Sequence, residues 1–224
     1  MSSDLLEGLP LRSFRLLTAL LVSLVLATSC ASSTPAPAAA GTATCSYPEK
    51  GTAAKAATPP AGVEPNTGTA TVTIGLGSGS VTIAMDKSKT PCTIGSFVHL
   101  ASSGYFDGTT CHRLTTSASL KVLQCGDPSG TGGGGPGYSF ADETNASMTY
   151  PTGTVAMANS GANTNGSQFF LVYGDSQLNP DYTVFGTITG GLDVLTKIAA
   201  AGVSDGSDDG TPASPVTISK VTVS

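Results

Sequence analysis

Residues 157–170 read MANSGANTNGSQFF, and this stretch decides the fold. Its two ends belong to short apolar segments, residues 154–157 and residues 169–172. The residues between these segments are rich in Asn, Gly and Ser. Such a pattern predicts two β-strands joined by a loop. Successive side chains of a strand point to opposite faces, so we expect Phe169 to enter the core and Phe170 to face the other side.

Strand patterns continue on both sides of this stretch. Residues 69–76 and 80–85 alternate apolar and polar side chains around Gly77-Ser78-Gly79, which predicts a hairpin. Further short strands are predicted at residues 110–114, 122–125, 183–188 and 216–223. The sequence thus predicts eight strands in all.

Two segments have a helical pattern. Thr90-Pro91 places a capping residue before a proline at the first helical position, and apolar residues then recur at helical spacing until Gly104. Residues 191–200 predict a second helix with one apolar face. We therefore expect a mainly β protein, an eight-stranded antiparallel barrel capped by two α-helices.

Charge and hydropathy exclude two classes of protein. The chain has 224 residues and a net charge of −5, so it lacks the basic surface that nucleic acid requires. It contains no apolar run of 18 residues, which excludes a multi-pass membrane protein.

The N-terminus has the pattern of a targeting segment. Arg12 and Arg15 precede the apolar residues 16–27, which are too few to span a bilayer but fit a secretory signal. The sequence Leu26-Ala27-Thr28-Ser29-Cys30 resembles the lipobox of bacterial lipoproteins. That resemblance implies a signal peptide over residues 1–29, a lipid on Cys30, and anchoring to the outer face of the bacterial cell membrane. Ordinary secretion is the alternative.

Residues 30–67 are interpreted as a tether, followed by a folded domain over residues 68–224. Of residues 31–67, 29 are Ala, Ser, Thr, Pro or Gly, a composition that cannot bury enough apolar area to offset its ordering entropy. Cys45 interrupts this composition and indicates that part of the tether is pinned down.

Four cysteines follow Cys30, and an oxidising environment outside the cytoplasm favours their pairing. Because Cys111 and Cys125 flank segments that are predicted to be neighbouring strands, we prefer that pair. Cys45 and Cys92 would then clamp the tether onto the domain. A zinc site is the competing interpretation, although the chain has no CxxC motif and only two histidines.

Several motifs occur together in a fixed order. Residues 104–114 read GYFDGTTCHRL and residues 123–127 read LQCGD; residues 157–170 and the sequence YTVFG at residues 182–186 follow. This order and spacing resembles the cyclophilin family of peptidyl-prolyl cis-trans isomerases. The resemblance extends over nearly the whole predicted domain.

The resemblance implies rotation about Xaa-Pro peptide bonds without a cofactor or a metal. Rotation must break amide resonance, which costs roughly 18–20 kcal/mol. Arg113 occupies the family's catalytic position and could donate to the deconjugated nitrogen, because a guanidinium stays charged at neutral pH. Phe170 would form the floor of the proline pocket, and Gln168 would position Arg113 or the substrate.

The resemblance also implies a set of residues that bind the substrate chain. They are Gln124, Val122, Gly132, Ala158, Asn159, Ser160, Leu178 and Tyr182. Asn159 would offer its backbone groups to the substrate. Since the reaction needs no proton transfer, His112 is interpreted as a strand residue that is hydrogen-bonded inward.

Four positions depart from the usual family pattern. Lys121 stands where a pocket Phe is usual, Val122 replaces a Met, Gln177 replaces a Trp of many eukaryotic members, and Tyr182 replaces a His. We expect a shallower, more polar pocket, with weaker activity on short peptides and reduced cyclosporin affinity.

Two hypotheses about function follow. The first is a monomeric isomerase that binds Pro-containing unfolded or flexible polypeptides and assists the folding of exported proteins. The second is a surface-anchored chaperone or Pro-peptide binding module with little turnover. A metal-binding or redox lipoprotein is a third interpretation, and it depends only on the cysteines.

Overall fold

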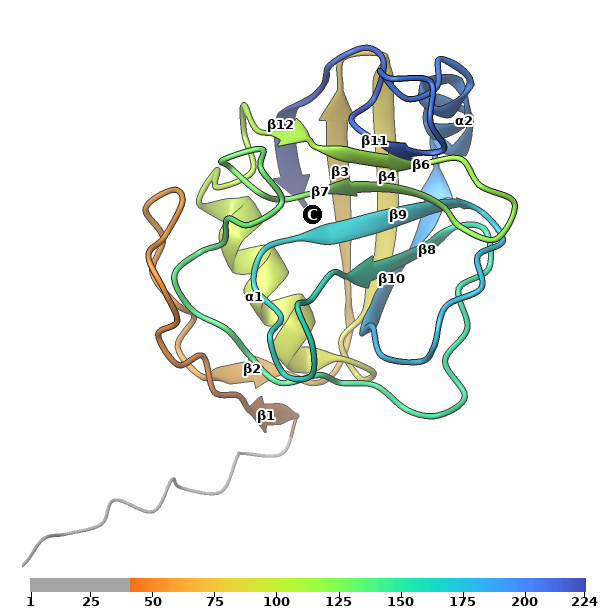
Figure 1. The fold of residues 1–224 in the computed structure, drawn as a ribbon. Coiled ribbons are helices and arrows are strands. Elements are labelled where there is room, and N and C mark those ends of the chain that lie inside the picture. The colour runs from red at the N-terminus through yellow and green to blue at the C-terminus, as the bar shows by residue number, and fades with distance from the viewer. Residues whose placement is uncertain (1–40) are drawn as a thin grey trace, which may run out of the picture. The chain divides into compact units, whose positions relative to one another are not determined.

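The computed structural model describes residues 41–224 (Figure 1). The predicted signal peptide, Cys30 and the first part of the tether lie outside the described residues. None of the helices in the described part is long and apolar enough to cross a bilayer.

One large antiparallel sheet forms the body of the domain, with the order β11-β6-β7-β9-β8-β10-β4-β3-β12-β5. Its strands are β3 (Thr69–Leu76), β4 (Gly79–Asp86), β5 (Thr110–Cys111), β6 (Arg113–Thr115), β7 (Lys121–Cys125), β8 (Thr154–Met157), β9 (Phe169–Gly174), β10 (Val184–Gly190), β11 (Asp209–Gly210) and β12 (Val216–Val223). Only His112 separates β5 from β6, although β5 pairs with β12 and β6 pairs with β7. The sheet therefore curls so far that β5, at one end of the order, and β6, next to the other end, are consecutive in the chain.

The expected mainly β architecture is confirmed, but the expected count of eight strands is wrong, because the sheet has ten. The predicted strand at residues 110–114 is divided in two at His112, where the chain changes its pairing partner. The other addition is β11, which pairs with β6. Two residues within a loop of Ser, Asp and Gly offer no alternation from which a strand could be predicted.

Both predicted helices are present, as α1 (Pro91–Ser102) and α2 (Leu192–Ala200). They contact different parts of the sheet: α1 packs against β12, and α2 packs against β4 and β9 (Figure 1). The Thr90 side chain does not make the expected cap hydrogen bond. Instead the Glu143 carboxylate accepts from the N–H groups of Cys92 and Thr93, at 3.1 and 2.8 Å.

The main core contains a cluster of aromatic rings between α1 and the sheet. Phe169 packs edge-to-face against Phe97 and Phe106, with ring centroids 5.2 and 5.6 Å apart. Phe170 is also buried, but it belongs to a separate apolar cluster on the other face of β9. The predicted division of this aromatic pair is confirmed, and it leaves Phe170 free to line a site.

The structure differs from the predicted tether. Residues 41–67, called here the N-terminal arm, fold onto the domain. Within the arm, β1 (Thr42–Thr44) and β2 (Val63–Pro65) pair with each other, and both contact α1 (Figure 1). The interpretation of these residues as a tether, with a domain boundary at Gly68, is therefore corrected: they are part of the folded unit.

A few well-placed side chains hold the arm despite its composition. A disulfide joins Cys45 to Cys92 in α1. Tyr47 is buried and donates to the Cys92 carbonyl at 2.8 Å. Lys55 donates to the carbonyls of Gly104 and Tyr105, both at 2.8 Å. An average over composition conceals such anchors, because each one is a single residue among many Ala, Thr and Pro.

The other disulfide joins Cys111 to Cys125 and links β5 to β7. All four cysteines of the described residues are thus paired, in the connectivity that the sequence analysis preferred. The pair in the sheet lies directly beside the residues that the resemblance assigns to catalysis.

Candidate active site

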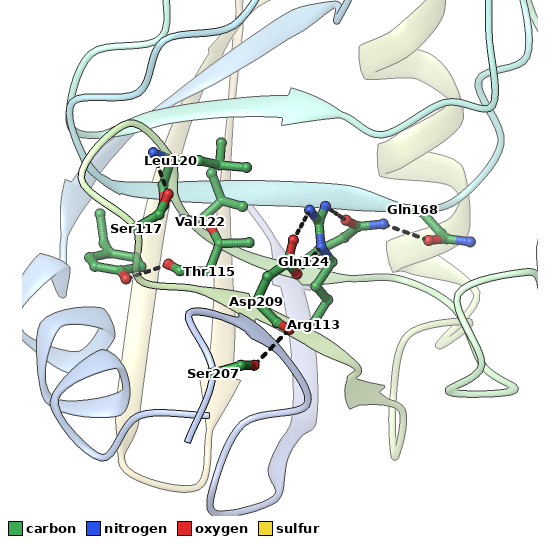
Figure 2. Close-up of polar contacts among 10 residues, drawn as sticks. Arg113, Thr115, Ser117, Leu120, Val122, Gln124, Gln168, Ser207 and Asp209 are labelled. Carbon is green, nitrogen blue, oxygen red and sulfur yellow. Dashed lines mark hydrogen bonds and ion pairs between the residues drawn. The ribbon is translucent and has the colours of Figure 1, made fainter. Parts of the chain in front are cut away.

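A row of polar side chains crosses β6, β7 and β9 (Figure 2). The sheet register pairs Arg113 with Gln124, and Gln168 directly precedes β9. Arg113 Nη1 donates to Gln124 Oε1 at 3.2 Å, and Gln124 Nε2 donates to Gln168 Oε1 at 2.9 Å (Figure 2). The structure thus brings together two catalytic candidates, Arg113 and Gln168, through Gln124.

The row continues from Gln168 into the glycine-rich loop. Gln168 Nε2 donates to the carbonyls of Gly132 and Gly134, at 2.9 and 3.0 Å. Both amides of the row therefore have a defined orientation, because each accepts through its oxygen and donates through its NH₂ group. The conformation of the loop therefore sets the position of the carbonyls that orient Gln168.

Asp127 holds that loop, and the sequence analysis assigned it no role. Its side chain is fully buried. It accepts from the N–H groups of Ser129, Gly132 and Gly134, at 2.7, 2.7 and 3.0 Å. Burial raises the pKa of this carboxyl, but the hydrogen bonds from Ser129, Gly134 and Gly132 outweigh it, so the pKa lies below its ordinary value. A Cβ at Gly134 would collide with the carboxylate, which explains one glycine of the run.

Asp209 also orients Arg113, and the sequence analysis assigned Asp209 no role. Its Oδ1 accepts from Arg113 Nε at 2.7 Å, and its Oδ2 accepts from Nη2 at 2.8 Å (Figure 2). The hydrogen bond to Asp209 is the main cause that raises the pKa of Arg113, and the same hydrogen bond lowers the pKa of Asp209. A guanidinium has five N–H groups. Two of them remain without a partner among the described residues and are available to a ligand.

A pocket of about 210 Å³ lies beside the guanidinium and has both polar and apolar lining residues. It is lined by Arg113, Leu120, Val122, Gln124, Ala158, Asn159, Phe170, Leu178 and Tyr182. We call it the ring pocket. Eight of these nine residues are among those that the sequence analysis expected in the site, and Leu120 is the exception.

Leu120 corrects the expectation for Lys121. Side chains alternate along this segment, so Leu120, Val122 and Gln124 share the face that lines the ring pocket. Lys121 does not line it; its stem instead lies over Gly174 on the neighbouring strand. The residue of this segment that reaches the pocket next to Val122 is therefore Leu120, and Lys121 does not replace a pocket side chain.

Aromatic side chains fix the floor of the ring pocket. Phe170 and Tyr182 pack edge-to-face with centroids 5.6 Å apart. Tyr150 lies behind them, donates to the Tyr182 carbonyl at 2.9 Å and accepts from the Tyr182 N–H at 3.0 Å. Burial raises the pKa of Tyr150. Tyr150 is a supporting residue that the sequence analysis missed, since nothing near it in the sequence indicates its partner.

Asn159 provides a free segment of backbone at the rim. Its side chain donates to the Asp181 carbonyl at 2.9 Å, which orients the residue. Within residues 41–224, its own N–H and C=O make no hydrogen bond to the chain. They can therefore pair with an extended peptide, as strands pair with each other.

The remaining expected residues lie next to the ring pocket or away from it. Gln168, Gly132 and Ser160 line a neighbouring pocket, and the two pockets share Gln124, Ala158 and Asn159. Gln177 is exposed and lines neither of them.

His112 differs from its expected environment. Both of its ring nitrogens are buried and have no hydrogen-bond partner in the described part of the chain, so the expected inward hydrogen bond is not made. Desolvation lowers the pKa of His112, which favours the neutral ring. The imidazole does not line the ring pocket.

Together these features define an antiparallel β protein with two adjoining pockets on its sheet. The ring pocket has an aromatic floor, free backbone groups on its rim and an oriented cation. Such a site can hold a cyclic apolar side chain and donate to an adjacent peptide bond. It has no need of a nucleophile for this.

Comparison with known proteins identifies the family. The sequence model of the family "Cyclophilin type peptidyl-prolyl cis-trans isomerase/CLD" matches residues 70–223. The chain belongs to this family.

Curated relatives carry the same family name. The chain is 57% identical over 152 residues to a "Probable peptidyl-prolyl cis-trans isomerase B" of Mycobacterium tuberculosis, covering 62% of this chain and 49% of the relative. It is 55% identical over 149 residues to a protein of the same name from Mycobacterium leprae, covering 61% and 50%. The chain thus spans about half the length of these relatives.

Solved structures show the same fold. A cyclophilin type peptidyl-prolyl cis-trans isomerase of Cryptosporidium parvum is 30% identical with a TM-score of 0.63, covering 70% of this chain and 98% of that one. A crystal structure of that protein in the presence of the dipeptide Ala-Pro matches with a TM-score of 0.62, 30% identity, and coverage of 69% and 98%.

Proposed function

We propose that this protein is a peptidyl-prolyl cis-trans isomerase that acts on Xaa-Pro bonds of unfolded or flexible polypeptides. One observation carries the proposal: the oriented Arg113 guanidinium, with two N–H groups free among the described residues, lies on the wall of the ring pocket beside Phe170. The family relationship, and the relatives' printed names, support the same activity.

The proposed mechanism divides the substrate into a fixed part and a moving part. The proline ring enters the ring pocket and packs on Phe170, while the free backbone of Asn159 holds the chain. The carbonyl before the proline then rotates. As amide resonance is lost, the proline nitrogen becomes pyramidal and regains a lone pair, to which a free N–H of Arg113 donates. No bond is made or broken, and no proton is transferred.

The proposal is tested by the isomerisation rate of a Xaa-Pro peptide with the purified full chain, using Arg113→Ala as the matched inactive variant. A rate well above the slow uncatalysed exchange, lost in the variant, supports it. A folded chain that binds the peptide without accelerating exchange would instead favour the chaperone or binding-module hypothesis.

Asp209 should act as a positioning residue for Arg113. We expect Asp209→Asn to lower kcat/KM about fivefold to tenfold, mainly through kcat, because the two charge-assisted hydrogen bonds that orient the guanidinium are weakened. Both side chains of the pair are partly exposed, at 38% and 50%, so the stability of the domain should change little. Asp208→Asn, which changes the neighbouring carboxyl in the same loop, is the matched control.

A double-mutant cycle separates positioning from a merely structural effect. In an Arg113→Ala background, Asp209→Asn should cause no further loss of rate, because its only route to the reaction has been removed. Equal losses in both backgrounds would show that Asp209 acts on the fold and not on Arg113.

We also propose that the protein is exported and anchored by a lipid on Cys30, so that its substrates are exported proteins. The two disulfides support a location outside the reducing cytoplasm. Membrane fractionation of cells that express the natural chain or Cys30→Ser tests the anchor. The natural chain should sediment with membranes and the variant should not; equal distribution would favour simple secretion.

A further inference from the structure

The N-terminal arm forms part of a second pocket in the groove. This pocket has a volume of about 310 Å³ and lies next to the ring pocket, with which it shares Gln124, Ala158 and Asn159. One wall is the glycine-rich loop and the segment after it, from Gly132 to Ser139. Residues 50–52 of the arm contribute a further part of the lining. We call it the arm pocket.

The arm's contribution lies outside the part of the chain that defines the family. The family model matches residues 70–223, so residues 50–52 lie outside it. The family match therefore does not predict what these residues select.

Backbone hydrogen bonds hold the arm along the loop. Lys50 N–H donates to the Gly137 carbonyl at 2.8 Å, and Ala54 N–H donates to the Gly135 carbonyl at 2.9 Å. In the reverse direction, Ser139 N–H donates to the Pro48 carbonyl at 3.0 Å. Together with the Cys45–Cys92 disulfide, these bonds fix residues 50–52 as a wall.

Lys50 is the only charged residue in the lining of the arm pocket. Its side chain is exposed and makes no ion pair or hydrogen bond with the described residues. The carboxylate of Asp127, below the loop, is fully buried and occupied by N–H donors. The Lys50 side chain therefore has no competing partner among residues 41–224.

We propose that Lys50, as part of the lining of the arm pocket, selects substrates that carry a carboxylate close to the isomerised proline. The proposal rests on the isomerase function above and adds the class of substrate. An extended chain advances about 3.3 Å per residue, so adjacent pockets accept residues within a few positions of each other. The preferred substrate then carries Asp or Glu within about three residues of the proline.

The test compares peptides that differ in one residue. A neutral Ala-rich peptide with one Xaa-Pro bond is the reference, and Glu or Lys is placed at each position within three residues of the proline. With the natural chain, kcat/KM should be about threefold to fivefold higher for Glu than for Lys at one position. Because the contact is exposed, the preference should weaken at high salt.

Lys50→Glu is the decisive variant. It should reverse the preference at that position, because it reverses the charge that residue 50 brings to the lining of the arm pocket. Lys220→Glu makes the same change of net charge at an exposed residue of β12 and should keep the natural preference. Thermal unfolding of both variants checks that they are folded.

The outcomes distinguish this inference from the proposed function. Turnover of all peptides without discrimination by charge would overturn the inference and leave the isomerase intact. Reversal in both variants would show a general field effect and would overturn the role of Lys50. If no peptide is turned over, peptide binding to the natural chain and to Lys50→Glu decides: weaker binding of the Glu peptide to the variant supports the inference, and equal binding overturns it.

Discussion

Replacing Arg113 by alanine should lower kcat/KM for a Xaa-Pro peptide by a factor of about 100 or more, the range seen when one transition-state donor is removed. Arg113 is the only arginine after residue 15 of the sequence. It is also the only charged residue that lines the ring pocket. Gln124 cannot replace it, because a neutral amide is a weaker donor than a guanidinium and one of its two N–H groups already donates to Gln168. The loss should appear in kcat, since the apolar contacts that bind the proline ring remain.

The same variant should remain folded. Arg113 is partly exposed, and its main partner Asp209, in the two-residue strand β11, is also partly exposed, so the ion pair contributes little to the free energy of unfolding. Thermal unfolding of the variant checks this expectation. Arg113→Lys is an informative companion: it keeps the positive charge but loses the fork that Asp209 and Gln124 orient, so an intermediate rate is expected. A rate close to that of the natural chain in Arg113→Ala would remove Arg113 from the mechanism.

The elements that the sequence predicts well are those with a local signal. β8 and β9 were expected from apolar segments around residues 157–170, and the opposite directions of Phe169 and Phe170 follow from alternation alone. Leu120 could have been found in the same way, because alternation from Val122 and Gln124 leads directly to it. Aligning Lys121 with the usual pocket Phe concealed that signal.

The residues that the sequence does not reveal act across long separations. Asp209 is 96 residues from Arg113, and Tyr150 is 32 residues from the Tyr182 backbone that it holds. Neither contact has a periodicity or a spacing motif, since both depend on how loops close over the sheet. The arm was missed for a related reason: its Ala-, Thr- and Pro-rich composition suggests a linker, while its attachment depends on Cys45, Tyr47 and Lys55.

Asp127→Asn should destabilise the domain by about 1–3 kcal/mol, the usual cost of leaving buried hydrogen-bond donors without an acceptor. An amide retains one oxygen, but its NH₂ group would face the N–H donors of Ser129, Gly132 or Gly134 that the carboxylate now accepts. Asp205→Asn is the matched control. Asp205 makes the same type of turn, accepting from the N–H of Ser207 two residues later, but it is exposed. Its replacement should change the midpoint of urea unfolding very little.

The pH dependence of stability gives Asp127 a second signature. Its folded pKa is lowered relative to the ordinary carboxyl value near 3.8, so its contribution to stability is fully present above that value. The contribution is lost as the pH falls through the folded pKa, because protonation then removes the acceptor. Asp127→Asn has no such group to titrate, so the stability difference between the natural chain and the variant should shrink below about pH 4. A difference that stays constant down to pH 3 would contradict the assignment.

The Asp127→Asn substitution should also lower the rate of the reaction. The carboxylate holds Gly132 and Gly134, and their carbonyls orient Gln168, which orients Gln124 and through it Arg113. We therefore expect Asp127→Asn to lower kcat about tenfold at a temperature at which the variant is fully folded. Gln168→Ala interrupts the row one step later and separates the two effects: it should lower kcat similarly with a much smaller loss of stability. A folded Asp127→Asn variant with the natural kcat would show that the loop supports the fold and not the row.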